Sequence, residues 1–301
     1  MILGAGAAGL TAGIYTSRAK LRTLILNEGV IGGQMVLTNE IANYPGVETT
    51  SGYAVATIMK KQAKSFGCEI KSNIKIQTYR LNDEIKSVEL EDGRIFHARS
   101  VILAPGGRPR PLNIPGEDEF KGKGVSYCAT CDGEFFTGKD LVVVGGGNSA
   151  LEEAVALTTY ANKVTIVHQF DHFQAFRHAI EEAEKNPKVE FIMESELRGF
   201  SGDEKLKKVS MEHLSTGKIT EMDIDGTFVF IGYIPGTEDF KGLIEMNERN
   251  EIIVDADMKT DIPGVFAAGD CIVKRYRQVT TAVADGTIAA LSAADYLRNV
   301  K

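Results

Sequence analysis

Two cysteines separated by two residues are the side chains of this sequence whose spacing most directly suggests chemistry. Cys128 and Cys131 lie in the segment CATCDG, and Asp132 follows the second cysteine directly. A CxxC pair closes a small ring that forms and opens readily, and a neighbouring carboxyl group can carry the protons that thiol–disulfide exchange moves. We therefore interpret these three side chains as a redox dithiol with its acid–base group.

Two other interpretations of the cysteine pair stay open at this point. A structural zinc site needs a second pair of ligands at a comparable spacing. Neither the single cysteines Cys68 and Cys271 nor the histidines at 168, 172 and 178 supply such a pair. A pair of inert buried thiols is the second alternative. We expect no metal, and one close pair among four cysteines indicates no disulfide framework.

The elements that must position such a dithiol are indicated by a glycine-rich segment that occurs twice. Residues 2–9 read ILGAGAAG and residues 143–150 read VVGGGNSA, an offset of 145 − 4 = 141 residues. Each copy follows an apolar strand, opens a segment without helix breakers, and precedes a β-branched strand. This order predicts two βαβ nucleotide-binding folds, and therefore an α/β protein with two Rossmann-like domains.

The second of these domains is predicted to be inserted into the first. The segments LNIPGE near Pro115 and GYIPGT near Pro235 contain Pro-Gly pairs, which are typical of linkers between domains. We therefore expect an outer, discontinuous domain of residues 1–108 and 237–301. The inserted domain, residues 109–236, would carry the cysteine pair.

The first glycine turn has the residues that dinucleotide binding requires. Gly4 permits the tight turn, Gly6 lets the backbone approach a pyrophosphate, and Gly9 lets helix and strand pack closely. The amino end of the following helix directs its positive dipole at the phosphates. Glu28 lies 28 − 9 = 19 residues after the last glycine, at the end of the next predicted strand, where it can bind ribose hydroxyls. The sequence therefore predicts a bound adenine dinucleotide.

The second glycine turn keeps the backbone pattern without the recognition residues. Gly145, Gly147 and Ala150 satisfy GxGxxA, but the next predicted strand ends in HQF at 168–170. This end has no acid for a ribose and no arginine for a 2′-phosphate, which guanidinium groups bind in a bidentate way. We expect a nucleotide fold whose second site is either altered or vestigial.

Charge and composition exclude several other classes of protein. The formal net charge of −7 disfavours a nucleic-acid-binding protein, which usually carries a basic face. No apolar run approaches the roughly 20 residues that span a bilayer, so we expect no membrane partner. The first glycine turn begins at Gly4, which leaves no room for a signal peptide before it. The sequence therefore predicts a cytoplasmic protein.

Several motifs occur in the order found in low-molecular-weight thioredoxin reductases, and the resemblance covers essentially the whole chain. A CxxC inside the second nucleotide-binding domain is a specific mark of this family, because flavoproteins that resemble glutathione reductase carry their cysteines in the flavin domain. The matching motifs are GAGAAGL near the start, GGQ at 32–34, NYPG at 43–46, CATCDG at 128–133, GGGNSALEEA from 145, and AAGD with RQVTTAVADG between 267 and 286.

The resemblance implies FAD in the outer domain. In such enzymes Cys131 would face the flavin and receive its electrons, Cys128 would attack the disulfide of thioredoxin or a similar dithiol protein, and Asp132 would act as general acid and base. Members of the family are homodimers. The positions that match the family's flavin-binding motifs are Gly4, Gly6, Gly9, Glu28, Gly33, Gln34, Asn43, Gly269, Asp270, Arg277, Gln278 and Val279.

One departure from the family pattern concerns the electron donor. The family's HRRxxxR motif, which grips the 2′-phosphate of NADPH, reads HQFDHFQ at 168–174 and has none of its arginines. We therefore predict that NADPH is a poor donor and that reduced ferredoxin is a better one, because some thioredoxin-reductase-like proteins with eroded nucleotide motifs accept electrons from ferredoxin. An acidic ferredoxin needs a basic landing site. Candidate positions for that site are Arg108, Arg110, Lys121, Lys123, Lys274, Arg275 and Arg277.

The leading hypothesis is an FAD-dependent disulfide reductase that passes electrons through the dithiol to thioredoxin or a related dithiol protein. The alternatives among enzymes are an ordinary NADPH-dependent thioredoxin reductase and a flavoprotein that serves another partner, such as a peroxide-reducing protein. From a different class comes a non-catalytic flavoprotein, a sensor or binding module. The presence of both cysteines together with Asp132 favours an enzyme, because a binding module does not need all three.

Overall fold

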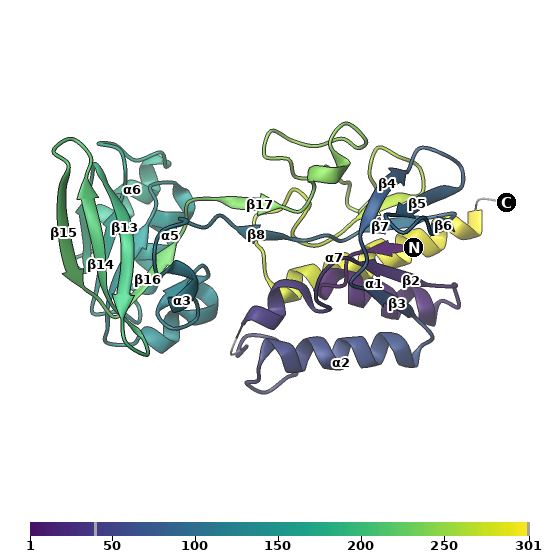
Figure 1. Cartoon of the computed structure of the whole chain (residues 1–301), viewed down its shortest axis with the longest axis horizontal. Coiled ribbons are helices and arrows are strands. Elements are labelled where there is room, and N and C mark those ends of the chain that lie inside the picture. The colour runs from purple at the N-terminus through teal and green to yellow at the C-terminus, as the bar shows by residue number, and fades with distance from the viewer. Residues whose placement is uncertain (39–40, 300–301) are drawn as a thin grey trace. The chain divides into compact units, whose positions relative to one another are not determined.

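The chain forms two compact units, as the computed structural model in Figure 1 shows for residues 1–38 and 41–299. Unit 1 consists of Met1–Arg108 and Ile234–Lys301, and unit 2 consists of Pro109–Tyr233. Unit 2 is therefore inserted into unit 1.

Unit 1 is built on a five-stranded parallel sheet with the strand order β18-β7-β1-β2-β3. Alternate residues of a strand point to opposite faces of the sheet. Ile2 accordingly packs into a core beneath the helices, whereas Leu3 packs into a second core with residues of 240–272. The strands are β1 (Ile2–Leu3), β2 (Leu24–Asn27), β3 (Glu69–Ser72), β7 (Val101–Leu103) and β18 (Val265–Ala267).

Three helices pack against the same core of unit 1 (Figure 1): α1 (Ala7–Arg18), α2 (Gly52–Ser65) and α7 (Val279–Asn299). Helices α1 and α7 lie side by side. Small residues permit this approach, since a Cβ at Gly286 would lie 2.3 Å from the carbonyl oxygen of Ala8. The long C-terminal helix therefore rests on the beginning of α1.

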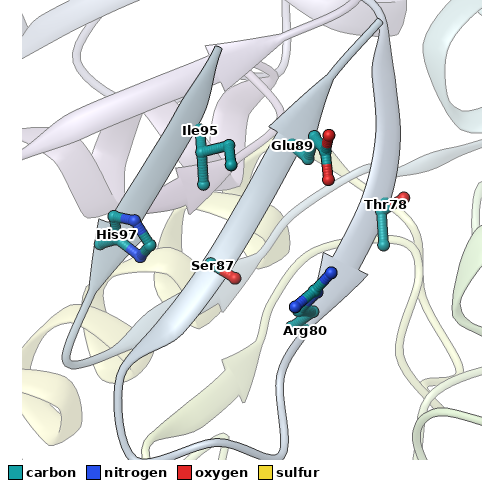
Figure 2. A pocket seen from close by; sticks show the side chains of 6 residues that line it. All are labelled: Thr78, Arg80, Ser87, Glu89, Ile95 and His97. Carbon is teal, nitrogen blue, oxygen red and sulfur yellow. The ribbon is translucent and has the colours of Figure 1, made fainter. Parts of the chain in front are cut away.

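A small antiparallel sheet of unit 1 carries a shallow pocket of about 100 Å³ on one face (Figure 2). Its strands are β4 (Ile76–Arg80), β5 (Lys86–Leu90) and β6 (Ile95–Ala98). None of the site residues predicted from the sequence lines this pocket. The lining residues are Thr78, Arg80, Ser87, Glu89, Ile95 and His97.

Unit 2 repeats the parallel plan with the strand order β12-β11-β10-β16-β9. Helices α5 (Asn148–Leu157) and α6 (Arg177–Lys185) pack on one face of this sheet, and an antiparallel sheet packs on the other. The parallel strands are β9 (Val125–Ser126), β10 (Asp140–Val144), β11 (Lys163–Val167), β12 (Val189–Ile192) and β16 (Gly226–Val229), and the antiparallel ones are β13 (Ser195–Gly202), β14 (Leu206–His213) and β15 (Lys218–Asp223).

Two parallel sheets that each follow the βαβ plan confirm the predicted α/β class with one Rossmann-like unit inserted into another. The short elements are η1 (Gly33–Leu37), β8 (Gly107–Pro109), α3 (Glu117–Phe120), α4 (Ala129–Asp132), η2 (Gly133–Phe136), β17 (Tyr233–Pro235) and η3 (Glu238–Phe240).

The interpretation of the first Pro-Gly pair as a linker is wrong. The chain passes into unit 2 at Pro109, and Pro115 lies within that unit. The carbonyl oxygen of Pro115 accepts a hydrogen bond from the N–H of Phe200 at 2.9 Å, and Gly116 has a φ of +83°. The pair therefore makes a turn packed against β13, where glycine is needed for its backbone conformation.

None of the helices formed by residues 1–38 and 41–299 is long and apolar enough to cross a membrane.

Candidate active site

The first glycine turn joins β1 to α1 and leaves open space at its middle glycine. A Cβ at Gly4, whose φ is +106°, would lie 2.1 Å from the carbonyl oxygen of Ala104. A Cβ at Gly9 would lie 2.0 Å from the carbonyl oxygen of Gly4, so only glycine fits at either position. A Cβ at Gly6, in contrast, would meet no atom within 4 Å. Gly6 is the N-cap of α1 and no side chain caps this helix, so its first amide groups can receive an anion.

Two other predicted segments lie against this turn. A Cβ at Gly33 would lie 3.2 Å from the Cα of Gly6, and Gln34 follows Gly33 in η1. A Cβ at Gly269 would lie 2.9 Å from the Cβ of Ala8. The structure thus brings three glycine-containing segments, far apart in the sequence, to the amino end of α1.

Asp270 lies in a cluster of charged side chains. Lys274 is largely buried and pairs with Asp285, and its Nζ lies 3.9 Å from a carboxylate oxygen of Asp270. Asp285 also accepts a hydrogen bond from the N–H of Gly269 at 3.2 Å. These contacts anchor the segment 269–274 to α7.

The remaining predicted residues near α7 are also held by side-chain contacts. Nδ2 of Asn43 donates a hydrogen bond to Oε1 of Gln278 at 3.3 Å. The guanidinium group of Arg277 pairs with the buried carboxylate of Glu251. Val279, the last of the predicted residues, begins α7.

The end of β2 carries one predicted residue and one that sequence reasoning missed. Oε1 of Glu28 accepts a hydrogen bond from the N–H of Ile76 at 2.7 Å, which orients the carboxylate. Oδ1 of the buried Asn27 accepts a hydrogen bond from the N–H of Ala5 at 2.9 Å, and its amide group donates to the carbonyl oxygen of Gly29. Asn27 therefore fixes the glycine turn. The signal that could have found it is a polar residue that ends the otherwise apolar strand LILN.

The second glycine turn has the same backbone plan as the first. Gly145 has a φ of +137°, and a Cβ there would lie 2.4 Å from the carbonyl oxygen of Phe230. A Cβ at Gly147 would meet no atom within 4 Å, and Gly147 is the N-cap of α5 without a side-chain cap. The ring of His168 lies against this turn, because a Cβ at Gly146 would lie 2.3 Å from its Cε1.

His168 is 5% exposed, and its Nε2 has no hydrogen-bond partner among the residues that the structure describes. Burial lowers the pKa of this imidazole, so the neutral form is favoured. The ring stacks on Phe173 at 5.7 Å and meets the edge of Phe170 at 5.3 Å. Aromatic side chains thus surround the place where the family motif has arginines.

Strand register identifies the counterpart of Glu28 in unit 2. Leu3 pairs with Leu26 and Val144 pairs with Val167, so His168 corresponds to Asn27 and Gln169 corresponds to Glu28. A neutral amide therefore stands where unit 1 has a carboxylate.

The predicted dithiol occurs as a disulfide in unit 2. Cys128 and Cys131 are bonded, with their Cα atoms 5.3 Å apart. The N–H of Cys131 donates a hydrogen bond to Sγ of Cys128 at 3.2 Å. Both sulfurs are partly exposed at the beginning of the one-turn helix α4. The pair can therefore be opened by reduction without unfolding the core of the unit.

Asp132 contacts a residue that sequence reasoning did not single out. Oγ of Ser126 donates a hydrogen bond to Oδ2 of Asp132 at 2.6 Å and accepts one from the N–H of Cys128 at 3.1 Å. Burial raises the pKa of Asp132, and the hydrogen bond from Ser126 offsets part of that rise. The two residues lie six positions apart, so only the turn around Cys128 brings them together.

A buried carboxylate ties the beginning of unit 2 to the residue before the dithiol. Glu117 accepts hydrogen bonds from the N–H groups of Leu112 at 2.8 Å and Asn113 at 2.6 Å. Its Oε1 also accepts one from the hydroxyl of Tyr127 at 2.5 Å. Burial and the bond to Glu117 raise the pKa of Tyr127.

The sequence outside these contacts also identifies the protein's relatives. Residues 1–286 match the sequence model of the family described as pyridine nucleotide-disulphide oxidoreductase. The chain belongs to this family. The thioredoxin reductase of Peptoclostridium acidaminophilum is 46% identical to this oxidoreductase over 303 residues, which cover 98% of this chain and 96% of that protein. A Clostridium pasteurianum protein described as a 34.2 kDa protein in rubredoxin operon is 46% identical over 297 residues, with coverages of 99% and 96%.

Solved structures agree with the sequence relatives. The thioredoxin reductase of Streptococcus pyogenes matches this oxidoreductase with a TM-score of 0.93 at 41% identity, covering 99% of this chain and 97% of that one. These similarities show an oxidoreductase of the low-molecular-weight thioredoxin reductase type. The predicted recognition and the predicted enzyme class are therefore confirmed.

The other two cysteines of the oxidoreductase are unsuited to exchange. Cys68 and Cys271 are free and buried, and burial raises the pKa of Cys68 to about 11 and that of Cys271 to about 12. Thiols of this kind carry little thiolate at neutral pH and react slowly. Within residues 1–38 and 41–299, no group of three or more His, Cys, Asp or Glu side chains is placed to hold a metal ion.

Proposed function

We propose that this oxidoreductase is an FAD-dependent disulfide reductase that passes electrons through Cys128 and Cys131 to thioredoxin or a related dithiol protein. We also propose that reduced ferredoxin is a better donor than NADPH. The observation that carries the proposal is the bonded cysteine pair beside Asp132, whose carboxylate is buried and held by Ser126. A structural disulfide does not need a buried acid beside it.

The residues of unit 1 fit FAD. The open space at Gly6 leaves room for a pyrophosphate at the amino end of α1, and the carboxylate of Glu28 suits ribose hydroxyls. FAD would supply a carrier that takes electrons from the donor and reduces a disulfide with a pair of them. The residues proposed to hold it are Gly4, Gly6, Gly9, Glu28, Gly33, Gln34, Asn43, Gly269, Asp270, Arg277, Gln278 and Val279.

Cys128 is the sulfur proposed to attack the partner, because the N–H of Cys131 would stabilise a thiolate on it. The thiolate attacks one sulfur of the partner disulfide, forms a mixed disulfide and releases the other sulfur, which takes one proton. The thiolate of Cys131 then attacks Sγ of Cys128, restores the Cys128–Cys131 bond and releases the second sulfur, which takes another proton. The partner gains two electrons and two protons, and the dithiol loses the same electron pair.

Asp132 is the proposed carrier of these protons. Because burial raises its pKa, it holds a proton at a higher pH than an exposed aspartate does. The exposed ring of Phe135, in the η2 turn that follows Asp132, offers an apolar contact for a partner protein beside the cysteines.

Three observations support a donor other than NADPH. Residues 168–174 contain no arginine for the 2′-phosphate, and Gln169 stands in the position of Glu28. The name of the Clostridium pasteurianum relative refers to a rubredoxin operon, and rubredoxins are iron-containing electron carriers. Of the basic side chains considered as a landing site, Lys274 and Arg277 pair with acids of unit 1, whereas Lys121 and Lys123 are exposed.

An ordinary NADPH-dependent reductase is the second candidate. The space at Gly147 is open and α5 has no side-chain cap, so the phosphate-binding backbone of unit 2 has been kept. Homodimer formation is a further part of the proposal. Exposed apolar side chains on the packed helices α1 and α7, namely Tyr15, Ile288 and Leu291, are available for a contact between two copies.

Anaerobic reduction of the purified protein tests the proposal. We expect a yellow protein that reduced ferredoxin bleaches rapidly and micromolar NADPH or NADH bleaches slowly, with two new thiols titrated per chain. Cys128→Ser and Cys131→Ser should each abolish thioredoxin reduction, and only Cys131→Ser should trap a mixed disulfide with thioredoxin. A colourless protein that takes up no flavin contradicts the cofactor. Rapid bleaching by micromolar NADPH contradicts the donor and supports the second candidate.

A further inference from the structure

We infer that Ser126 is the positioning residue that orients Asp132 and keeps its carboxylate available for proton transfer beside Cys128. The inference rests on the proposed function for its catalytic meaning, but its geometry belongs to unit 2 alone. It assigns a role to a residue outside the CxxC motif.

The contacts of Ser126 connect the acid to the backbone of the attacking cysteine. The hydroxyl donates to Oδ2 of Asp132 at 2.6 Å, while its oxygen accepts the N–H of Cys128 at 3.1 Å. The serine is 5% exposed and ends the edge strand β9, so its side chain has little freedom to turn elsewhere. The position of the carboxylate is thereby set relative to Cys128.

The hydroxyl has one proton and two acceptors within reach. Oδ2 of Asp132 lies at 2.6 Å, and the carbonyl oxygen of Cys128 lies at 3.5 Å. A charged carboxylate at the shorter distance is the stronger acceptor, so the proton points to Asp132 while this residue is ionised. When Asp132 gains a proton, it can donate to Ser126, whose own proton can then turn to the carbonyl oxygen. Ser126 thus provides a partner for both protonation states.

No other charged group takes over this role. Burial and the hydrogen bond from Ser126 are the two causes of the shifted pKa of Asp132. The elements packed against α4 are η2 and α5, and their acids Glu134, Glu152 and Glu153 are not among the causes. On the side of β9, the phenol of Tyr127 is bonded to Glu117 instead. Removal of the Ser126 hydroxyl should therefore raise the pKa of Asp132 further.

The test measures the titration of Asp132 directly in the oxidised holoprotein. Carbon-13 NMR of protein labelled at its aspartate carboxyl groups follows the titration, and Asp132→Asn assigns the signal. We expect Ser126→Ala to move this titration to higher pH and Ser126→Thr, which keeps the hydroxyl, to restore it. Ser195 offers a matched control, because it is equally buried in unit 2 and bonds only to the carbonyl oxygen of Met193. Ser195→Ala should leave the titration of Asp132 unchanged.

Turnover with reduced thioredoxin as the product gives a second readout. The limb of the pH profile that Asp132 governs should move to higher pH in Ser126→Ala, so that turnover at a pH on that limb changes about tenfold. In the Asp132→Asn background, Ser126→Ala should change the profile no further. An unmoved carboxyl titration in a folded Ser126→Ala protein overturns the inference. So does an equal, pH-independent loss of turnover in both backgrounds. If no dithiol protein is reduced at all, the proposed function fails while the NMR titration still decides the role of Ser126.

Discussion

In unit 1 the N–H of Gly4 donates to the carbonyl oxygen of Leu26 at 2.8 Å, and in unit 2 the N–H of Gly145 donates to that of Val167 at 3.1 Å. The segment that returns over each turn is held alike, since Gly32 donates to Ala5 at 2.7 Å and Gln174 donates to Gly146 at 2.8 Å. The backbones of the two nucleotide folds therefore agree.

The two units differ in the side chains that follow the second strand. Asn27 supports the first turn through a hydrogen bond, whereas the ring of His168 rests on the second turn without one at its Nε2. Glu28 has the neutral Gln169 as its counterpart. The difference teaches that a phosphate-binding backbone persists independently of the few side chains that choose its ligand.

Matched alanine variants of the two open glycines give the largest expected contrast. Gly6→Ala and Gly147→Ala each place a methyl group where no protein atom lies within 4 Å, at φ values of −77° and −90°, so both should fold. Gly6→Ala should lose bound flavin and all turnover, because the methyl group occupies the space of the pyrophosphate. Gly147→Ala should keep both. Absorbance at the flavin band decides this, and equal loss of flavin from both variants would show that the units have been assigned wrongly.

Restoring the missing arginines tests the ligand choice of unit 2. We expect replacement of Gln169, Phe170 and Gln174 by arginine to strengthen NADPH binding roughly a hundredfold, because each charge-assisted hydrogen bond contributes about 1.5–3 kcal/mol. Titration calorimetry with NADPH and NADH measures the effect. NADH is the control and should gain little, since it lacks the 2′-phosphate. No gain for NADPH would mean that the space at Gly147 does not admit a dinucleotide.

Exchanging the counterpart residues should have a smaller effect. Glu28→Gln keeps an acceptor for the N–H of Ile76 but loses the negative charge, so FAD should bind about tenfold more weakly. The protein's stability to urea should stay nearly unchanged. Flavin release on dilution measures the affinity. An unchanged affinity would place the ribose away from the end of β2.

The smallest effect concerns pH. Because the folded pKa of His168 is lowered by burial, the folded protein binds fewer protons than the unfolded chain just below the ordinary histidine pKa. The stability from neutral His168 is thus present above pH 6.5 and is lost as the pH falls toward the folded pKa, by at most about 1.4 kcal/mol per pH unit. Urea unfolding at pH 7.5 and 5.5 should show this slope, and His168→Asn, which imitates Asn27, should reduce it. A slope that survives the substitution would assign it to other groups.

The sequence alone predicts the parts of this molecule that depend on local pattern. The repeat at an offset of 141 residues locates both glycine turns, because each turn needs its glycines at fixed positions. The pair Cys128 and Cys131 is likewise visible, since a CxxC spacing suffices for a disulfide. Both features are set by backbone geometry within a few residues.

Contacts made by folding were beyond the sequence. Ser126 reaches Asp132 only because the chain turns back at Cys128, and Pro115 lies in unit 2 because it packs against Phe200, far along the chain. The counterpart of Glu28 was also missed, because strand register and not sequence spacing identifies Gln169. Each of these depends on which segments become neighbours in space.

The buried carboxylate of Glu117 has a mechanical consequence. It joins the backbone at Leu112 and Asn113, just inside unit 2, to the side chain of Tyr127, which precedes Cys128. The raised pKa of Tyr127 keeps this joint protonated and intact through alkaline conditions. Bending of the chain at Arg108 and Pro109 is therefore transmitted to the disulfide segment as the movement of a stiff lever, not absorbed by a slack loop.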